Sequence, residues 1–217
     1  MKKKNKIVLL MALVTVALLI LGGGIIKLIL LNKPEDKVVV DTITSFADMD
    51  QNSADLKVAR SAVGYGLFTA DDQERFLPDE TINRAEFARL LTRVMALEYS
   101  LTLQPSYGDV DIDHPDYESI EAAGPLINCS VSSSGMKLFM PDGEISHKEA
   151  LLALGQLVSP GSDSFDWLEK IGISSDDALL SQPDTSMTRV AAARLFSNVI
   201  NSRLETIADD FQIISIK

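Results

Sequence analysis

Apolar residues follow two different patterns along the chain. From Ile7 to Ile26 they form a nearly unbroken run, interrupted only by Thr15 and three glycines. As a helix, this run would span roughly 30 Å, which matches the hydrocarbon core of a bilayer. After residue 46 the apolar positions recur at i, i+3, i+4 and i+7, the spacing that places them on one helix face. The pattern predicts a transmembrane helix followed by a mainly α-helical body.

The charges around the N-terminal run predict its orientation. Four lysines and the amino terminus precede it, so the positive-inside rule places the body outside the cytoplasm. We predict a cytoplasmic basic tail and anchor over residues 1–31 and a linker over 32–45. The alternative is a cleaved signal peptide with its apolar region at Ile7–Leu21, which would release the body to the cell wall. The continuing run IIKLILL (25–31) favours the single-pass anchor, because mature chains rarely begin with apolar runs.

One turn-and-helix motif occurs three times in the body. The copies read PDETINRAEFARLLTRV from Pro78, PDGEISHKEALLALGQL from Pro141 and PDTSMTRVAAARLFSNV from Pro183. At one shared register, each copy has a residue type that favours a helix N-cap: Asn83, Ser146 and Thr188. This repetition predicts tandem helix-turn-helix repeats.

The residue three positions after each N-cap differs among the copies. Glu86 and Glu149 complete a capping box in the first two copies, whereas the third has Ala191. Behind each cap follows an apolar stripe, which predicts one buried helix face per copy. The stripes are Phe87, Leu90, Leu91 and Val94; Ala150, Ala153, Leu154 and Leu157; and Ala192, Leu195, Phe196 and Val199.

A second predicted helix precedes each copy and ends near Gly66, Gly124 or Gly172. Glycine at such a place suits a left-handed C-cap. The stretches SFAD (45–48) and SYGD (106–109) open the first two copies, but the third copy has no counterpart. We therefore expect the third copy to be shortened.

These motifs together resemble the S-layer homology (SLH) family over about residues 44–208. The resemblance is strongest in FLPDETINRAEFA (76–88). It implies two recognisable repeats at 46–104 and 105–160, and a truncated third repeat with a C-terminal tail at 161–217. It also implies that the repeats form a pseudo-threefold bundle. Family modules usually attach bacterial surface proteins to anionic secondary cell-wall polysaccharides, often through pyruvylated sugars.

The resemblance also implies ligand contacts at the arginine of the family motif. Arg84 and Arg189 hold that position in the first and third copies, and His147 holds it in the second. A guanidinium at a helix start could bind an acidic sugar group. The alternative for Arg84 is an arginine paired with Asp79 or another local carboxylate. His147 is largely neutral outside acidic conditions and lacks the two-pronged arginine geometry.

Asp48 and Asp109 match the aromatic-x-Asp start of the family repeat. The resemblance implies that they orient a ligand hydroxyl, with capping of a turn as the alternative. The stretch DVDIDHPDYESIE (109–121) also resembles a calcium loop in its first aspartates. However, it has His114 where an EF-hand needs glycine and Ile120 where it needs glutamate, so calcium stays a minor alternative and no metal is expected.

Composition excludes several other classes of protein. The net charge is −11, and residues 1–37 carry +5, so the rest of the chain holds about −16 and is a poor partner for nucleic acid. Cys129 is the single cysteine, which rules out an intramolecular disulfide. With two histidines, no glycine-rich phosphate loop and no nucleophile elbow, the chain is expected to be non-catalytic and to need no cofactor.

The sequence thus predicts a membrane-anchored cell-envelope module that binds anionic wall polysaccharide and tethers membrane to wall. The alternative is a protein-interaction scaffold in a membrane-associated envelope assembly, with a protein partner and decayed glycan binding. The incomplete third copy and His147 are the features that keep this alternative open.

Overall fold

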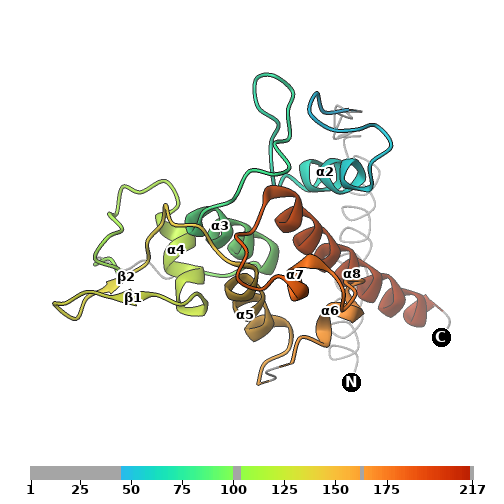
Figure 1. Ribbon diagram of the computed structural model, residues 1–217. Coiled ribbons are helices and arrows are strands. Elements are labelled where there is room, and N and C mark those ends of the chain that lie inside the picture. Colours follow the sequence, from blue (N-terminus) through green and yellow to red (C-terminus); the bar gives the residue numbers. More distant parts are fainter. Residues whose placement is uncertain (1–44, 100–103, 162–163, 216–217) are drawn as a thin grey trace, which may run out of the picture. The chain divides into compact units, whose positions relative to one another are not determined.

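The computed structural model describes residues 45–99, 104–161 and 164–215, with side chains described up to residue 204. The predicted anchor (1–31) and all of the linker except Ser45 lie outside the described residues. Among the residues that are described, no helix is both long and apolar enough to cross a membrane. The described residues belong to one compact unit, which is mainly helical (Figure 1).

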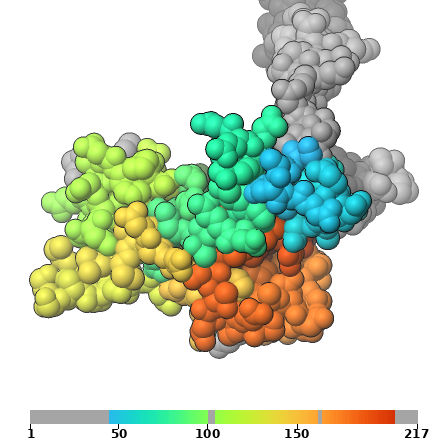
Figure 2. Space-filling view, turned by 45° about the horizontal axis from the view of Figure 1, so that its top comes forward, coloured from blue at the N-terminus to red at the C-terminus, as the bar shows by residue number. Residues whose placement is uncertain are grey.

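This unit consists mainly of helices, with one short hairpin between η1 and α5. The helices are α2 (Ala54–Gly64), α3 (Arg84–Met95), α4 (Tyr117–Ala123), the 3-10 turn η1 (Gly124–Leu126), α5 (His147–Val158), α6 (Trp167–Lys170), α7 (Ala178–Ser181) and α8 (Arg189–Ser215). The hairpin pairs β1 (Ser130–Val131) antiparallel with β2 (Lys137–Leu138). The first and third turn-and-helix copies lie against each other, since α2 and α3 both pack on α8 (Figure 2).

The predicted N-caps are confirmed. Asn83 accepts a hydrogen bond from the Glu86 backbone N–H at 2.8 Å, and the Glu86 carboxylate accepts one from the Asn83 N–H at 3.0 Å. Ser146 and Glu149 form the same capping box at the start of α5. In the third copy, the Thr188 hydroxyl accepts from the N–H of the third helical residue at 3.3 Å, without a reciprocal carboxylate. Each helix therefore begins where its cap predicted.

The predicted apolar stripes form a single core. All twelve stripe residues are buried except Val94 and Leu157, which are half-buried at the last turns of α3 and α5. The rings of Phe87 and Phe196 lie 5.6 Å apart and join α3 to α8. The helices of separate copies thus bury their apolar faces against one another.

Two of the three predicted glycine caps are correct, and one is wrong. Gly66 and Gly172 have φ angles of +66° and +78°. Gly124 instead has φ −57° and continues α4 into η1. A Cβ at Gly124 would lie 2.3 Å from the Tyr107 hydroxyl oxygen, so close packing is what requires glycine there. Burial also raises the pKa of Tyr107 to about 12.

Backbone hydrogen bonds join the three Pro-Asp turns (residues 78–83, 141–146 and 183–188) in a closed ring. The first helical N–H of each copy donates to a carbonyl of the next turn: Arg84 to Gly143 at 2.8 Å, His147 to Thr185 at 2.9 Å and Arg189 to Glu80 at 2.8 Å. The second helical N–H does the same: Ala85 to Pro141 at 3.1 Å, Lys148 to Pro183 at 2.9 Å and Val190 to Pro78 at 3.1 Å. These N–H groups have no partner within their own helices, so each turn satisfies the start of another helix.

Glu144 joins all three turns through its side chain. Its carboxylate accepts a hydrogen bond from the Thr81 hydroxyl at 2.9 Å and another from the Ser186 hydroxyl. Thr81, Glu144 and Ser186 each stand three residues after the proline of their turn. The hydrogen bonds from Ser186 and Thr81 hold the pKa of Glu144 below its usual value of 4.5.

We predict that Glu144 makes the ring sensitive to acid. Because the folded-state pKa is lowered, the charged carboxylate stabilises the folded protein above about pH 4.5, and this contribution is lost as the pH falls through the folded-state pKa. Glu144→Gln should therefore lower the urea midpoint at pH 7, and its difference from wild type should shrink on acidification. Glu118→Gln, at an exposed glutamate of α4, is the control. If the difference in urea midpoint between Glu144→Gln and wild type stays constant down to pH 3, this role is contradicted.

Candidate functional site

Arg84 lies inside the protein, with 2% of its surface exposed. Its Nε donates to the Phe139 carbonyl at 2.8 Å, one Nη donates to Glu149 at 2.9 Å, and the other donates to the Asn128 carbonyl. The guanidinium carbon also lies 5.3 Å from the centre of the Phe139 ring. The carboxylate partner is Glu149 of the second copy, not Asp79 of the local turn. The guanidinium thus joins the first copy to the second.

Arg189 makes an equivalent joint between the third copy and the first. Its Nε donates to the Phe76 carbonyl at 2.8 Å and one Nη donates to the Thr69 carbonyl at 3.1 Å. The guanidinium carbon lies 4.8 Å from the Phe68 ring centre and 5.2 Å from that of Phe76. Its side chain is 14% exposed, so Arg189 is more accessible than Arg84.

His147 makes the joint between the second copy and the third. It is buried, and its Nδ1 lies 3.1 Å from the Ala178 carbonyl oxygen and 3.0 Å from the Gln182 carbonyl oxygen. Both neighbours are acceptors, so we assign the proton to Nδ1. Arg84, His147 and Arg189, which share one register of the motif, therefore lie at three separate joints, and each bonds to carbonyl groups of the next copy.

Asp48 and Asp109 hold backbone turns, as the alternative interpretation predicted. Asp48 accepts hydrogen bonds from the N–H groups of Phe76 and Leu77 at 3.0 and 2.7 Å. Asp109 accepts from the corresponding N–H groups in the second copy, Phe139 and Met140, at 2.8 and 2.7 Å. Leu77 and Met140 have φ angles of 59° and 57°, which non-glycine residues seldom adopt, so each aspartate stabilises a strained turn.

The proposed calcium loop uses its first aspartate in the same way. Both carboxylate oxygens of Asp109 accept backbone hydrogen bonds. Within the described ranges, no cluster of three or more His, Cys, Asp or Glu side chains is placed to hold a metal ion.

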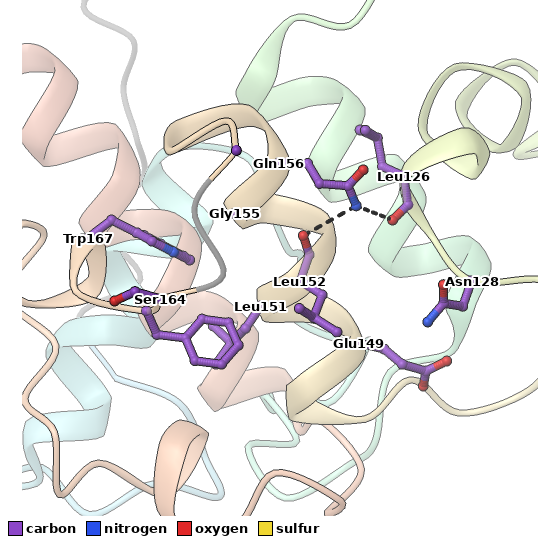
Figure 3. A pocket seen from close by; sticks show the side chains of 11 residues that line it. Leu126, Asn128, Glu149, Leu151, Leu152, Gly155, Gln156, Ser164 and Trp167 are labelled. Carbon is purple, nitrogen blue, oxygen red and sulfur yellow. Dashed lines mark hydrogen bonds between the residues drawn. The ribbon is translucent and has the colours of Figure 1, made fainter.

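A cleft of about 390 Å³ opens beside α5 (Figure 3). We call it the α5 cleft. Its lining comes from one face of α5 and from two stretches that lie on either side of it: Glu149, Leu151, Leu152, Gly155 and Gln156 from α5, Leu126 and Asn128 before it, and Gly161, Ser164, Phe165 and Trp167 after it. Sequence reasoning missed this cleft. The available signal was the surface-exposed Leu152, which is 39% exposed on the opposite side of the helix from the core stripe.

The α5 cleft carries groups that can hydrogen-bond a hydroxyl-rich ligand. Gln156 is exposed and donates to the Leu126 carbonyl at 3.1 Å, and Asn128 supplies a second exposed amide. The indole of Trp167 lies against α5 at Gly155, where a Cβ would come 3.4 Å from the indole nitrogen, an ordinary van der Waals contact. Among the lining residues that the structure describes, Glu149 is the single ionisable one, and Arg84 pairs with it. The lining of the α5 cleft thus combines polar and apolar side chains.

The comparisons with known proteins agree with part of the sequence interpretation. Residues 45–88 match the S-layer homology domain, a stretch that contains Asp48, all of α2 and the start of α3 with Arg84. The match does not extend to the second and third copies of the motif. A comparison with curated proteins finds no match.

We predict that Arg84 supports folding directly. Arg84→Met should lower the free energy of unfolding by about 2–4 kcal/mol, because it leaves the Phe139 carbonyl without its donor and the Glu149 carboxylate without its cation. Urea titration followed by helical circular dichroism measures this loss. The matched control is Arg60→Met on the exposed face of α2. An unchanged urea midpoint for Arg84→Met would contradict this role in folding and would favour the alternative that Arg84 contacts a ligand.

Proposed function

We propose that this chain is a non-catalytic cell-envelope module that binds anionic wall polysaccharide through the α5 cleft. The S-layer homology match at residues 45–88 indicates a cell-wall-binding module. The observation that carries the choice of site is the α5 cleft, with its exposed amides and the partly exposed ring of Phe165. Amides can hydrogen-bond sugar hydroxyls, and aromatic rings can pack against the apolar face of a sugar.

In this proposal the body contains two complete SLH-type repeats and a truncated third, arranged as a pseudo-threefold bundle. The ring of turn-to-helix hydrogen bonds supports this arrangement, because each copy makes the same pair of contacts with the next. The proposed role of the family arginine position also changes. Arg84, Arg189 and His147 hold the copies together, and the ligand binds beside them.

The proposed location is the outer side of a bacterial membrane. Residues 1–31 would anchor the chain, with the linker placing the body outside. A fully extended linker of residues 32–45 reaches at most about 48 Å, so the body would meet polymer close to the membrane. The chain would thereby tether the membrane to the wall.

A protein-interaction scaffold is the second candidate, and exposed apolar side chains favour it. Val131, Met136 and Met140, in and beside the β1–β2 hairpin, are 66%, 51% and 43% exposed. Such side chains could contact a protein partner. Crosslinking in cells separates the candidates, because glycan adducts support polysaccharide binding and a single stoichiometric protein adduct supports the scaffold.

We predict that Gln156→Ala weakens binding to purified walls by about 2–10-fold, the effect of one neutral hydrogen bond. Co-sedimentation with walls, before and after extraction of the polysaccharide, measures the affinity. Gln73→Ala, at an exposed glutamine of a distant turn, should bind as wild type does. Thermal melting of both variants tests whether the fold is intact. Equal sedimentation of wild type with extracted and intact walls would contradict the proposed function.

We also predict that the full-length protein fractionates with membranes and resists a high-salt wash. A twenty-residue apolar span is held by burial, which salt does not weaken. Protease added outside wall-stripped cells should digest the body. A protected body would reverse the proposed orientation, and release by salt would contradict the anchor.

A further inference from the structure

The β1–β2 hairpin lies at the edge of the compact unit and carries two exposed thioether side chains (Figure 1). Met136 directly precedes β2 and is 51% exposed, and Met140 follows β2 and is 43% exposed. The other methionines whose side chains the structure describes are less accessible, since Met49 and Met95 are half-buried and Met187 is fully buried. Among the described methionines, a small oxidant in solution therefore reaches Met136 and Met140 most easily.

Met136 packs the hairpin against the opening stretch of the second copy, residues 106–109. A Cβ at Gly108 would lie 2.2 Å from the Met136 Cε and 3.4 Å from its Sδ, so the side chain of Met136 covers this glycine. The Gly108 N–H donates to the Lys137 carbonyl at 2.8 Å. The thioether of Met136 therefore lies beside the backbone hydrogen bond that joins the opening stretch to β2.

Met140 makes a second link between the hairpin and the opening stretch. Its Sδ accepts a weak hydrogen bond from the Ser130 hydroxyl of β1 at 3.9 Å. The Asp109 carboxylate accepts from the Met140 N–H at 2.7 Å and so holds a residue whose φ angle is +57°. Met140 thus contacts β1 through its side chain and the opening stretch through its backbone.

The first copy makes the same backbone contact without any methionine. The Ala47 N–H donates to the Glu74 carbonyl at 3.0 Å, as Gly108 does to the carbonyl of β2. Other residues hold the registers of the glycine and of the two methionines in the first copy: Ala47, Gln73 and Leu77. The motif therefore folds without these thioethers, and the glycine of the second copy makes room for one of them.

We propose that Met136 and Met140 form a reversible oxidation site that controls the docking of the hairpin on the opening stretch. The oxidant is a small peroxide. A lone pair of the sulfur bonds to one peroxide oxygen as the O–O bond breaks, so the sulfur loses two electrons and the peroxide gains them. With hydrogen peroxide, the proton of the transferred oxygen passes to the departing hydroxide, which leaves as water. The product is methionine sulfoxide, which sulfoxide reductases convert back.

Oxidation changes the contact that Met136 makes with Gly108. A sulfoxide is polar and carries one more oxygen than the thioether, and the sulfur of Met136 lies close to the glycine backbone. The side chain has to move away to place this oxygen in water, which exposes the hydrogen bond between Gly108 and Lys137. The oxidised hairpin is therefore held less firmly. This proposal does not depend on the proposed function.

The test uses the full-length protein in detergent with the substitution Cys129→Ala, because Cys129 is the single thiol of the chain and also reacts with peroxide. Hydrogen peroxide should oxidise Met136 and Met140 first and leave Met187 unmodified, as mapped by mass spectrometry of peptides. Hydrogen exchange at the Gly108 amide should then become about 2–10-fold faster, the effect of losing one neutral hydrogen bond. Treatment with methionine sulfoxide reductase should restore the slow exchange.

Two variants of this parent protein are the matched controls. The triple variant Gly108→Ala, Met136→Gln and Met140→Leu rebuilds the residues of the first copy. The double variant Met136→Leu and Met140→Leu keeps apolar side chains of similar volume. In both variants, hydrogen exchange at residue 108 should be equally slow with and without peroxide.

Three results would overturn the proposal. The oxidation site is wrong if Met136 and Met140 are oxidised no faster than Met187. The control of docking is wrong if both methionines are oxidised and hydrogen exchange at Gly108 does not change. It is also wrong if peroxide speeds this exchange in the double leucine variant as much as in the parent protein.

Discussion

The closed ring of hydrogen bonds among the three Pro-Asp turns is the constraint on which the rest of this structure depends. A helix start exposes N–H groups that need acceptors, and here those acceptors belong to the turn of another copy. Each copy therefore completes the next one, and the cores of α3, α5 and α8 are brought into contact by the same bonds. A single copy would leave its helix start and one side of its apolar stripe exposed, so the copies have to fold together.

Two phenylalanines show how the repeated turn-and-helix motif contributes to this ring. Phe76 and Phe139 each have their N–H bound by an aspartate of their own copy and their carbonyl bound by an arginine of the preceding one. The third copy lacks the aspartate-bearing opening and the phenylalanine. Its carbonyls at Ala178 and Gln182 instead meet one imidazole nitrogen. The histidine at position 147 thus has a structural explanation that is independent of any loss of binding.

Local features of this fold could be predicted from the sequence, and long-range ones could not. The capping boxes and apolar stripes follow from spacings of three and four residues, and the structure confirms them. The prediction of a left-handed cap at Gly124 was wrong, because the sequence pattern cannot show that the Tyr107 side chain packs closely against this residue. The partners of Arg84 lie 44 to 65 positions away in the sequence, so the burial of Arg84 could not be predicted from local spacing either. The α5 cleft combines three separated stretches, which only the folded chain brings together.

In the proposed function, the acidic body and the anionic polymer repel each other, which limits how binding can work. At physiological salt this repulsion extends over only about 8 Å, so the exposed amides of a local site such as the α5 cleft can still bind the polymer. The affinity of such a site for one sugar unit would be modest. A polymer repeats its units, however, and a membrane confines many copies of an anchored protein near it. Once one site is bound, the effective concentration of further sugar units near the other sites is high, so many weak sites together can hold the wall.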